Sequence, residues 1–199
     1  MIIIDLEQGS DNWFKEKLGK PSASNVSKII TNDGKPSKQR ECYLYELAGE
    51  ILSGKNENGY KNPTMEQGNI REDESRAYLE LTQGIELRRT GVIYKDEQKR
   101  FLISPDGIND NFGAELKNPL AKTQVKYLLD GTLPSEYFGQ VQMSLYVTEL
   151  PFWYFLSYVP NMKPLLLKVE PNKKYQEALA NELDKFCREL DEVVKKLRG

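Results

Sequence analysis

SPDGINDNFGAELK, residues 104–117, brings two acids and a lysine to one predicted reversal of the chain. Asp106 ends a β-prone run, a turn-rich segment follows, and Glu115 and Lys117 stand on the next predicted strand. Side chains alternate between the two faces of a strand, so Glu115 and Lys117 share one face while Leu116 points the other way, into the core. We therefore expect Asp106, Glu115 and Lys117 to converge.

This set of residues suits metal-assisted hydrolysis of a phosphodiester. Carboxylate oxygens are good ligands for Mg²⁺, and the charge of the metal acts on the scissile phosphate. Lys117 would orient or deprotonate the attacking water, and as a base it needs a pKa well below its ordinary value of about 10.4. The plain alternative is a hairpin with solvated charges.

The chain contains no histidine, and this absence excludes several hydrolytic mechanisms. Serine–histidine and cysteine–histidine nucleophiles, histidine–zinc hydrolases and histidine–metal nucleases all need an imidazole. Hydrolysis here must therefore use carboxylates, lysine and a hard metal ion. The formal net charge of −2 argues against a general nucleic-acid coat protein, but it does not exclude a nuclease, whose metal-binding acids add negative charge.

Length and composition predict a single domain over residues 1–199. Hydrophobic residues make up 39% and charged residues 29%, as in globular proteins, and no Pro/Gly/Ser-rich linker divides the chain. Neither a basic leader nor eighteen consecutive apolar residues are present, so secretion and membrane insertion are not expected. Cys42 and Cys187 lack CxxC spacing, which favours two reduced, buried thiols in a cytosolic protein.

Hydrophobic periodicity predicts helices and strands in both halves of the chain. The predicted helices cover residues 22–30, 40–52, 65–81, 136–148 and the chain from 172 onward. The predicted strands lie near residues 85–94, 100–105, 112–117, 152–159 and 165–170, whereas residues 53–63 are polar and turn-rich. These elements predict an α/β or α+β domain, with a central mixed β-sheet flanked by helices.

Further motifs accompany the SPDG…ELK stretch, which matches the signature of the PD-(D/E)XK nuclease superfamily and its restriction-endonuclease-like core. WFKEKLG at residues 13–19 and SAS at residues 22–24 resemble the W…R-x-G…TAS opening of the lambda exonuclease and viral recombinase family. GNIRE at residues 68–72 resembles its G-x-x-x-E helix motif, and QVQ at residues 140–142 its Q-x-Q helix motif. The blocks keep the family's order and approximate spacing over most of the chain.

The resemblance implies a metal site formed by the SPDG…ELK stretch. Asp106 and Glu115 would coordinate Mg²⁺, for which Mn²⁺ would substitute, with the carbonyl oxygen of Leu116 as a backbone ligand. Lys117 would act on the nucleophilic water. The implied activity is 5′-to-3′ degradation of one strand of linear double-stranded DNA to mononucleotides, which leaves 3′ single strands for recombination.

Three other residues are implied to serve this site. Glu72 would bring a further carboxylate from its helix, and Gln140 would order water or substrate beside Lys117. Each also has a plain interpretation as a residue of a solvated helix face, since Glu72 lies in the acidic run REDE. Asp96 falls where the family has another acid, although YKDEQ around it also indicates a hairpin turn.

Lys17 and Ser24 are implied to hold the 5′-terminal phosphate. In the family an arginine and the serine of TAS do so, and Lys17 stands at the arginine position here. Lysine supplies the charge but not the bidentate fork of arginine. Ser24 stands at a predicted helix start, where unpaired N–H groups and the helix dipole favour a phosphate, although an ordinary helix cap would look the same.

The resemblance also implies a ring-shaped homotrimer around DNA and a single-strand annealing protein as partner. A phage or prophage origin, with action in the bacterial cytoplasm and no membrane partner, goes with it. Two alternatives stay open: an endonuclease on the same fold, and a non-catalytic DNA-binding protein. The residues implied to bind the 5′-phosphate, Lys17 and Ser24, favour the exonuclease over an endonuclease. The presence of Asp106, Glu115 and Lys117 favours an enzyme over a non-catalytic protein. Basic surface for the duplex is expected from Arg88, Arg89, Lys95, Lys99, Arg100, Lys122 and Lys126.

Overall fold

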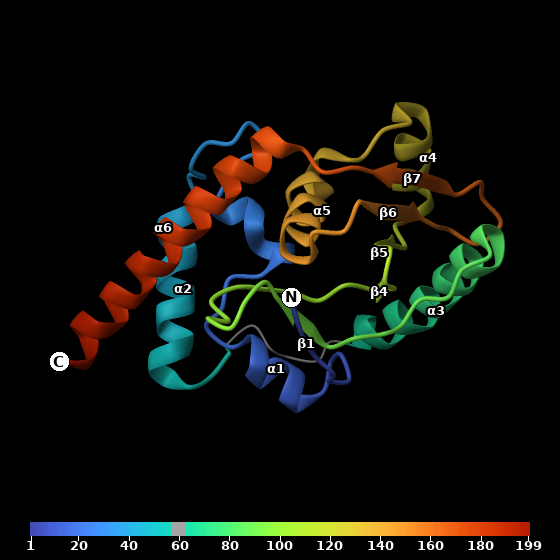
Figure 1. The fold of residues 1–199 in the computed structure, drawn as a ribbon. Helices are drawn as coiled ribbons and strands as arrows, with labels where there is room; N and C mark the ends of the chain where they lie inside the picture. Colours follow the sequence, from blue (N-terminus) through green and yellow to red (C-terminus); the bar gives the residue numbers. More distant parts are fainter. Residues whose placement is uncertain (57–62) are drawn as a thin grey trace.

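A mixed four-stranded sheet lies at the centre of the protein (Figure 1). The computed structural model describes residues 1–56 and 63–199, with side chains for all of these except residues 63–70. The sheet has the order β4-β5-β6-β7, formed by β4 (Gly107–Ile108), β5 (Phe112–Lys117), β6 (Phe152–Ser157) and β7 (Leu165–Val169). β5 and β6 are parallel and the other two pairs are antiparallel, so the predicted mixed sheet is confirmed.

A second, smaller sheet is antiparallel and stands beside the first. Its strands, in order, are β1 (Ile2–Ile4), β2 (Val92–Tyr94) and β3 (Leu102–Ile103). The helices are α1 (Asp11–Lys17), α2 (Arg40–Ser53), α3 (Pro63–Gln83), α4 (Ala121–Asp130), α5 (Ser135–Thr148) and α6 (Lys173–Arg198), with a 3₁₀ helix η1 (Ala23–Lys28). No helix in the described part of the chain is both long and apolar enough to cross a bilayer.

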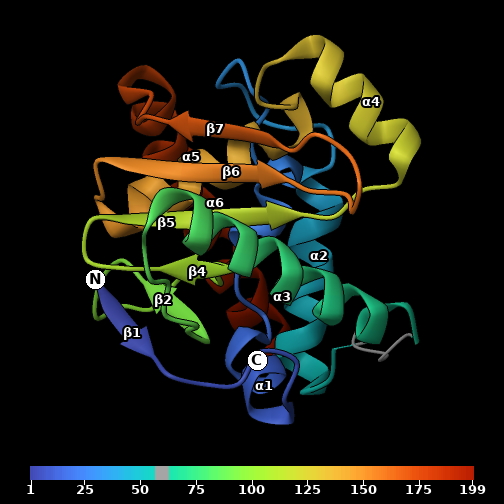
Figure 2. The same cartoon turned by 90° about the vertical axis from the view of Figure 1, so that its right-hand side faces the viewer.

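Helices cover both faces of the larger sheet (Figure 2). α3 lies over one face, where Leu79 packs against Leu116 of β5 and Leu156 of β6. α5 lies on the opposite face, and α2 and α6 pack beyond it in the main core with Trp153 and Phe155 of β6. Successive residues of β5 therefore face different helices: Leu116 faces α3, and its neighbours on either side face α5.

Two predicted strands are shorter than expected because the chain changes sheets within them. Residues 85–94 do not form one strand, since Arg88 pairs with Ile108 at the edge of the larger sheet before β2 begins in the smaller one. Of residues 100–105, only Leu102 and Ile103 form a strand, β3. Pairing ends there because Pro105 has no N–H to donate.

Two other predictions need correction. Residues 22–30 form the short 3₁₀ helix η1 in place of an α-helix, with i to i+3 bonds such as Ile29 N to Val26 O at 2.8 Å. Its serines and asparagine are poor α-helix formers, and Ile29 is held by tertiary burial instead. Cys42 is exposed, and only Cys187 of the two cysteines is buried, because Cys42 lies on the outer face of α2.

Candidate active site

The turn between β4 and β5 is closed by an asparagine. The side-chain oxygen of Asn109 accepts hydrogen bonds from the backbone N–H groups of Asn111 and Phe112, at 2.9 and 3.0 Å. Asparagine favours such turns because its side chain replaces a backbone partner. The tight turn fixes the register of the two strands that carry the predicted acids.

This register places Asp106 opposite Glu115. β4 and β5 pair Gly107 with Ala114, and one step further along the same ladder Asp106 faces Glu115. The backbone N–H of Leu116 donates to Asp106 Oδ2 at 2.6 Å. The Glu115 side chain is 2% exposed. A buried acid, Glu115, and a partly buried one, Asp106, thus meet at the start of β4.

Lys117 and Gln140 both contact Glu115. Lys117 Nζ forms an ion pair with Glu115 Oε1, in agreement with the predicted strand alternation. Gln140 Nε2 on α5 donates to the same oxygen at 2.6 Å, and Lys117 Nζ lies 5.1 Å from the ring centre of Tyr137. Gln142, the second glutamine of the motif, instead anchors α6 by accepting from Asn172 N at 2.7 Å.

Glu72 reaches the same region from α3. Arg76 lies one helical turn after Glu72, and its Nη2 is 3.5 Å from Glu72 Oε1. The same nitrogen donates a hydrogen bond to the backbone oxygen of Asp106. The side chains of Gly68, Asn69 and Ile70, the other residues of this motif, lie outside those that the structure describes. The structure therefore brings Glu72, Asp106, Glu115, Lys117 and Gln140 into one connected set.

The pKa of each of the three acids lies above its ordinary value. Burial is the main cause for each, and it raises the pKa of Asp106, of Glu72 and of Glu115, the last to about 7. The charge of Asp106 adds to the increase at both Glu72 and Glu115. Such a group of buried carboxylates favours the binding of a cation, and hard oxygen donors fit Mg²⁺ or Mn²⁺.

Lys117 is held in its charged form. Burial by itself lowers the pKa of this lysine, but the neighbouring Glu115 and Asp106 outweigh burial, and the pKa lies above its ordinary value. In this arrangement Lys117 can donate hydrogen bonds to a water or a phosphate oxygen, whereas it cannot accept a proton.

The acids are not yet arranged as a metal cage. Among the side chains that the structure describes, those of residues 1–56 and 71–199, no group of three acids or cysteines stands ready to hold a metal ion. One carboxylate oxygen of each acid is bound by the protein itself: Asp106 by Leu116 N, Glu115 by Lys117 and Gln140, and Glu72 by Arg76. The donor set fits a divalent cation, but these side chains must turn to bind it.

Lys17 lies at the end of α1 and is partly buried. Its Nζ is 3.8 Å from the ring centre of Trp13, and burial lowers the pKa of Lys17 to about 8. The Trp13 indole N–H bonds the backbone oxygen of Gly91 and the hydroxyl of Ser104, at 3.1 Å each. These hydrogen bonds connect α1, which carries Lys17, to the segment that precedes Asp106.

Ser24 is exposed on η1, with its hydroxyl 3.1 Å from that of Ser22. Ser22, and not Ser24, occupies the N-cap of η1, and its side chain makes no capping bond. The predicted α-helix start at Ser24 is therefore wrong, because two turns of 3₁₀ helix give only a small dipole. A phosphate contact by Ser24 would rest on its hydroxyl.

Asp96 lies in the turn between β2 and β3. Its Oδ1 accepts from Gln98 N at 3.0 Å, and the side chain is exposed. Asp106 follows the other end of the antiparallel pair, so Asp96 and Asp106 stand at opposite ends of this hairpin. The structure therefore agrees with the interpretation of Asp96 as a residue of a hairpin turn.

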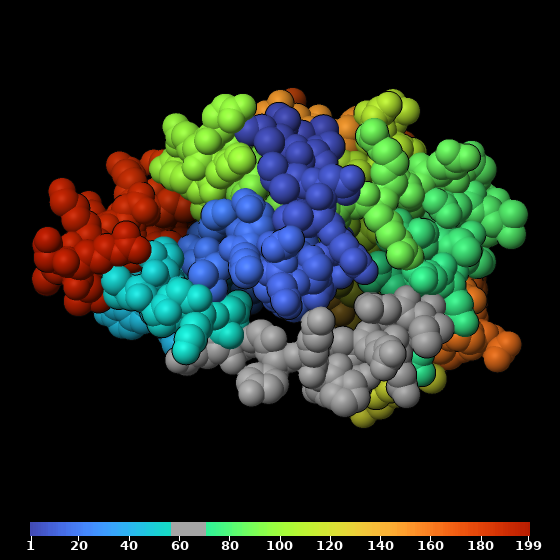
Figure 3. Space-filling view, turned by 90° about the horizontal axis from the view of Figure 1, so that it is seen from below, coloured from blue at the N-terminus to red at the C-terminus, as the bar shows by residue number. Residues whose placement is uncertain are grey.

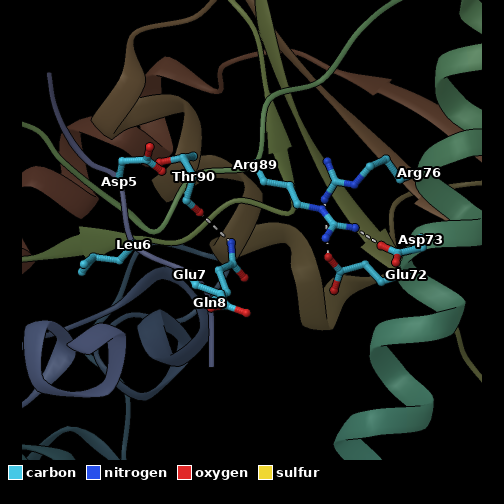
Figure 4. Close-up of a pocket in the computed structure, with 9 residues that line it drawn as sticks. All are labelled: Asp5, Leu6, Glu7, Gln8, Glu72, Asp73, Arg76, Arg89 and Thr90. Atoms are coloured by element: carbon cyan, nitrogen blue, oxygen red, sulfur yellow. Dashed lines mark hydrogen bonds and ion pairs between the residues drawn. The ribbon is translucent and has the colours of Figure 1, made fainter. Parts of the chain in front are cut away.

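Gln8 was not expected from the sequence to bear on the site. Its Nε2 donates to the backbone oxygens of Thr90 and Pro105, at 2.9 Å each. It lines a cavity of about 390 Å³ between the N-terminal segment and α3, which Glu72 and Arg76 also line (Figure 4). On the surface, the N-terminal segment and α1, in blue, lie beside α3, in green (Figure 3). Arg76 was missed as well, although its i+4 spacing from Glu72 is a usable signal.

Four of the seven basic residues expected to contact DNA are bound to the protein's own acids. The pairs are Arg88–Asp110, Arg89–Asp73, Lys95–Glu149 and Arg100–Asp184. These side chains do not form an unopposed positive surface.

A family model matches residues 12–151, a range that contains every block described above. That model is the YqaJ-like viral recombinase domain. The chain belongs to this family. The YqaJ-like domain also matches LHK-Exo, an alkaline exonuclease of Laribacter hongkongensis, with a TM-score of 0.84 and 25% identity over 95% of this chain and 96% of that one. The structure of LHK-Exo in complex with dAMP matches with a TM-score of 0.85 and 26% identity over the same shares of the two chains.

A curated relative is much longer than this YqaJ-like domain. The uncharacterized protein R354 of Acanthamoeba polyphaga mimivirus is 27% identical over 169 residues, which are 78% of this chain but 30% of that protein. This chain thus spans less than a third of it. The predicted family and fold class are confirmed by these matches.

Proposed function

We propose that this YqaJ-like domain is a Mg²⁺-dependent exonuclease that degrades one strand of linear double-stranded DNA from its 5′ end to mononucleotides. The observation that carries the proposal is the connected set of Glu72, Asp106, Glu115, Lys117 and Gln140. Family membership and the match to an alkaline exonuclease support the general class, a DNA nuclease. Residues 1–199 act as one catalytic domain.

Asp106, Glu115 and the Leu116 carbonyl would hold Mg²⁺ or Mn²⁺, with Glu72 close by. When bound, the metal supplies Lewis-acid charge to the scissile phosphate. Lys117 and Gln140, which both contact Glu115 Oε1, would donate to the attacking water or a phosphate oxygen once Glu115 holds the metal.

Lys17 and Ser24 would bind the 5′-phosphate of the DNA end. Two observations support this role for Lys17. No acid forms an ion pair with it in the described part of the chain, so its charge is available to a phosphate. Trp13, on the same helix, donates a hydrogen bond to Ser104, two residues before Asp106. LHK-Exo has been solved with dAMP, a mononucleotide of the kind that this activity releases. End recognition favours an exonuclease over an endonuclease with the same metal site.

The biological setting follows the family. The exonuclease would leave 3′ single strands for recombination with a single-strand annealing protein, in the cytoplasm of a bacterial host, and would be encoded by a phage or prophage. As a ring-shaped homotrimer it would enclose the duplex that it digests.

Digestion of end-labelled linear duplex, with Mg²⁺ and with chelator, tests the proposal. The wild type should release labelled mononucleotides with Mg²⁺ alone and leave covalently closed circular DNA intact. Asp106→Asn should abolish release while the far-ultraviolet circular dichroism spectrum and DNA binding stay unchanged. Asp110→Asn is the matched control, since this acid lies on the same hairpin but is exposed, and it should keep full activity.

Prompt nicking of the closed circle would instead indicate an endonuclease. Full digestion by Asp106→Asn would refute the assigned metal site, and DNA binding without any digestion by the wild type would indicate the non-catalytic alternative.

A further inference from the structure

Arg76 is a buried arginine that the mechanism above does not use. It lies on α3 one turn after Glu72 and is 7% exposed. Its Nη2 is 3.5 Å from Glu72 Oε1 and also donates to the backbone oxygen of Asp106. One guanidinium therefore joins two acids that reach the site from different elements, a helix and the turn before β4.

Gly107 leaves room for this guanidinium. A Cβ at residue 107 would lie 2.8 Å from Arg76 Nη1 and 3.0 Å from Leu87 Cβ. Gly107 does not have a positive φ, so space and not backbone conformation requires glycine at this position. The glycine of the SPDG segment is explained by the arginine packed against it.

Packing alone does not account for a charged side chain here. Arg76 Nε and Nη1 are buried and have no acceptor within the part of the chain that the structure describes. Each such unmade hydrogen bond destabilises the folded chain, and an apolar residue of similar volume would avoid this cost. The charge is instead used locally, since Nη2 alone contacts both Glu72 Oε1 and the backbone oxygen of Asp106.

The neighbouring contacts indicate the role of this charge. Gln8 Nε2 donates a hydrogen bond to the backbone oxygen of Pro105 at 2.9 Å. Gln8 and Arg76 therefore bind two consecutive carbonyl groups, those of Pro105 and Asp106. Hydrogen bonds of this kind, made behind the ligands, orient metal-binding carboxylates and typically change metal affinity or activity by about 10- to 100-fold.

We propose that Arg76 is a positioning residue of the metal site, which fixes Glu72 and Asp106 relative to each other and so sets the affinity for the divalent cation. The inference rests on the proposed function, because it takes these acids as the metal site. It predicts an effect on metal binding that is separate from any effect on folding.

Calorimetric titration of the full chain with Mn²⁺, without DNA, tests the role of Arg76. Arg76→Met should weaken Mn²⁺ binding by about 10- to 100-fold at an unchanged melting temperature. Arg76→Lys should recover part of the affinity, since it keeps the charge but has a shorter, differently shaped donor group. The Mg²⁺ concentration for half-maximal digestion should rise in parallel. Arg188→Met, which removes an exposed arginine of α6, should leave both measurements unchanged.

Gly107→Ala is a second variant that keeps the arginine but pushes its guanidinium away. It should weaken Mn²⁺ binding in the same direction, and it decides the matter if Arg76→Met does not fold. A folded Arg76→Met or Gly107→Ala protein that binds Mn²⁺ as tightly as the wild type would overturn the inference. If the wild type binds Mn²⁺ but digests no DNA, the proposed function fails while the affinity comparison still decides the role of Arg76.

Discussion

Lys17 is unusual among the lysines because burial lowers its pKa to about 8. A lysine with this pKa is charged below pH 8 and mostly neutral above it. If Lys17 holds the 5′-phosphate, the ratio of kcat/KM for 5′-phosphorylated over 5′-hydroxyl DNA should be largest below pH 8 and fall toward one as the pH rises through it, since kcat/KM reports the free enzyme. We expect a ratio of about tenfold or more at pH 7, the effect of one charged hydrogen bond.

Three variants separate this role from a general effect of charge. Lys17→Arg should keep the preference up to high pH, because arginine does not deprotonate in this range. Lys17→Met should lose it at every pH, and Lys15→Met, on the exposed face of the same helix, should behave as the wild type. A preference in the wild type that is constant from pH 6.5 to 9.5 would rule out Lys17 as its source.

Individual site residues differ in how far the sequence reveals them. The shared face of Glu115 and Lys117 follows from strand alternation, and Asp106 was placed near them by the predicted reversal of the chain, which the pairing of β4 and β5 shows. Gln8 and Arg76 donate to backbone oxygens of residues 97 and 30 positions away, and every residue has such an oxygen, so the sequence does not mark these partners. Such contacts are visible only once the chain is folded.

At the scale of elements, the parallel pair β5 and β6 depends on one glycine. Gly113 lies beside Trp153 in the register, and a Cβ at residue 113 would be 2.2 Å from the indole ring. The ring is rigid and fully buried in the core, so Gly113→Ala should lower the free energy of unfolding by about 1–3 kcal/mol.

Gly49→Ala is the opposite case. Nothing lies within 4 Å of a Cβ at this exposed position of α2, and alanine favours a helix, so stability should rise by about 0.5–1 kcal/mol. Urea denaturation of both variants measures the two changes. Equal stabilities for Gly113→Ala and the wild type would mean that the strands adjust to the methyl group.

The elements also show where local patterns fail. α2, α5 and α6 were predicted within two residues because an apolar face runs through each. α4 was missed because its pattern is inverted: Gln124 is buried and donates to the oxygens of Ser157 and Lys163, whereas Leu129 is 82% exposed. Only the fold shows that a polar residue of α4 faces inward.

For the whole molecule, the charges limit how one chain could stay on DNA. The formal net charge is −2, and Arg88, Arg89, Lys95 and Arg100 are paired with the protein's own acids. Affinity for the phosphate backbone grows with the number of phosphates that basic residues neutralise, and it falls steeply with salt. A single chain with this charge distribution should therefore leave the duplex quickly at physiological ionic strength.

A ring of three chains would remove this difficulty, because enclosure retains the duplex without strong attraction. We predict a mass three times the 22.9 kDa of one chain in light scattering. We also predict a specific response to excess heparin added after digestion has begun. Heparin should prevent free protein from binding new DNA ends, whereas protein already bound to DNA should continue digestion, even in 200 mM salt. A monomer that stops at once on addition of heparin would mean that one chain binds, cleaves and dissociates, and that retention by a ring plays no part in the proposed digestion.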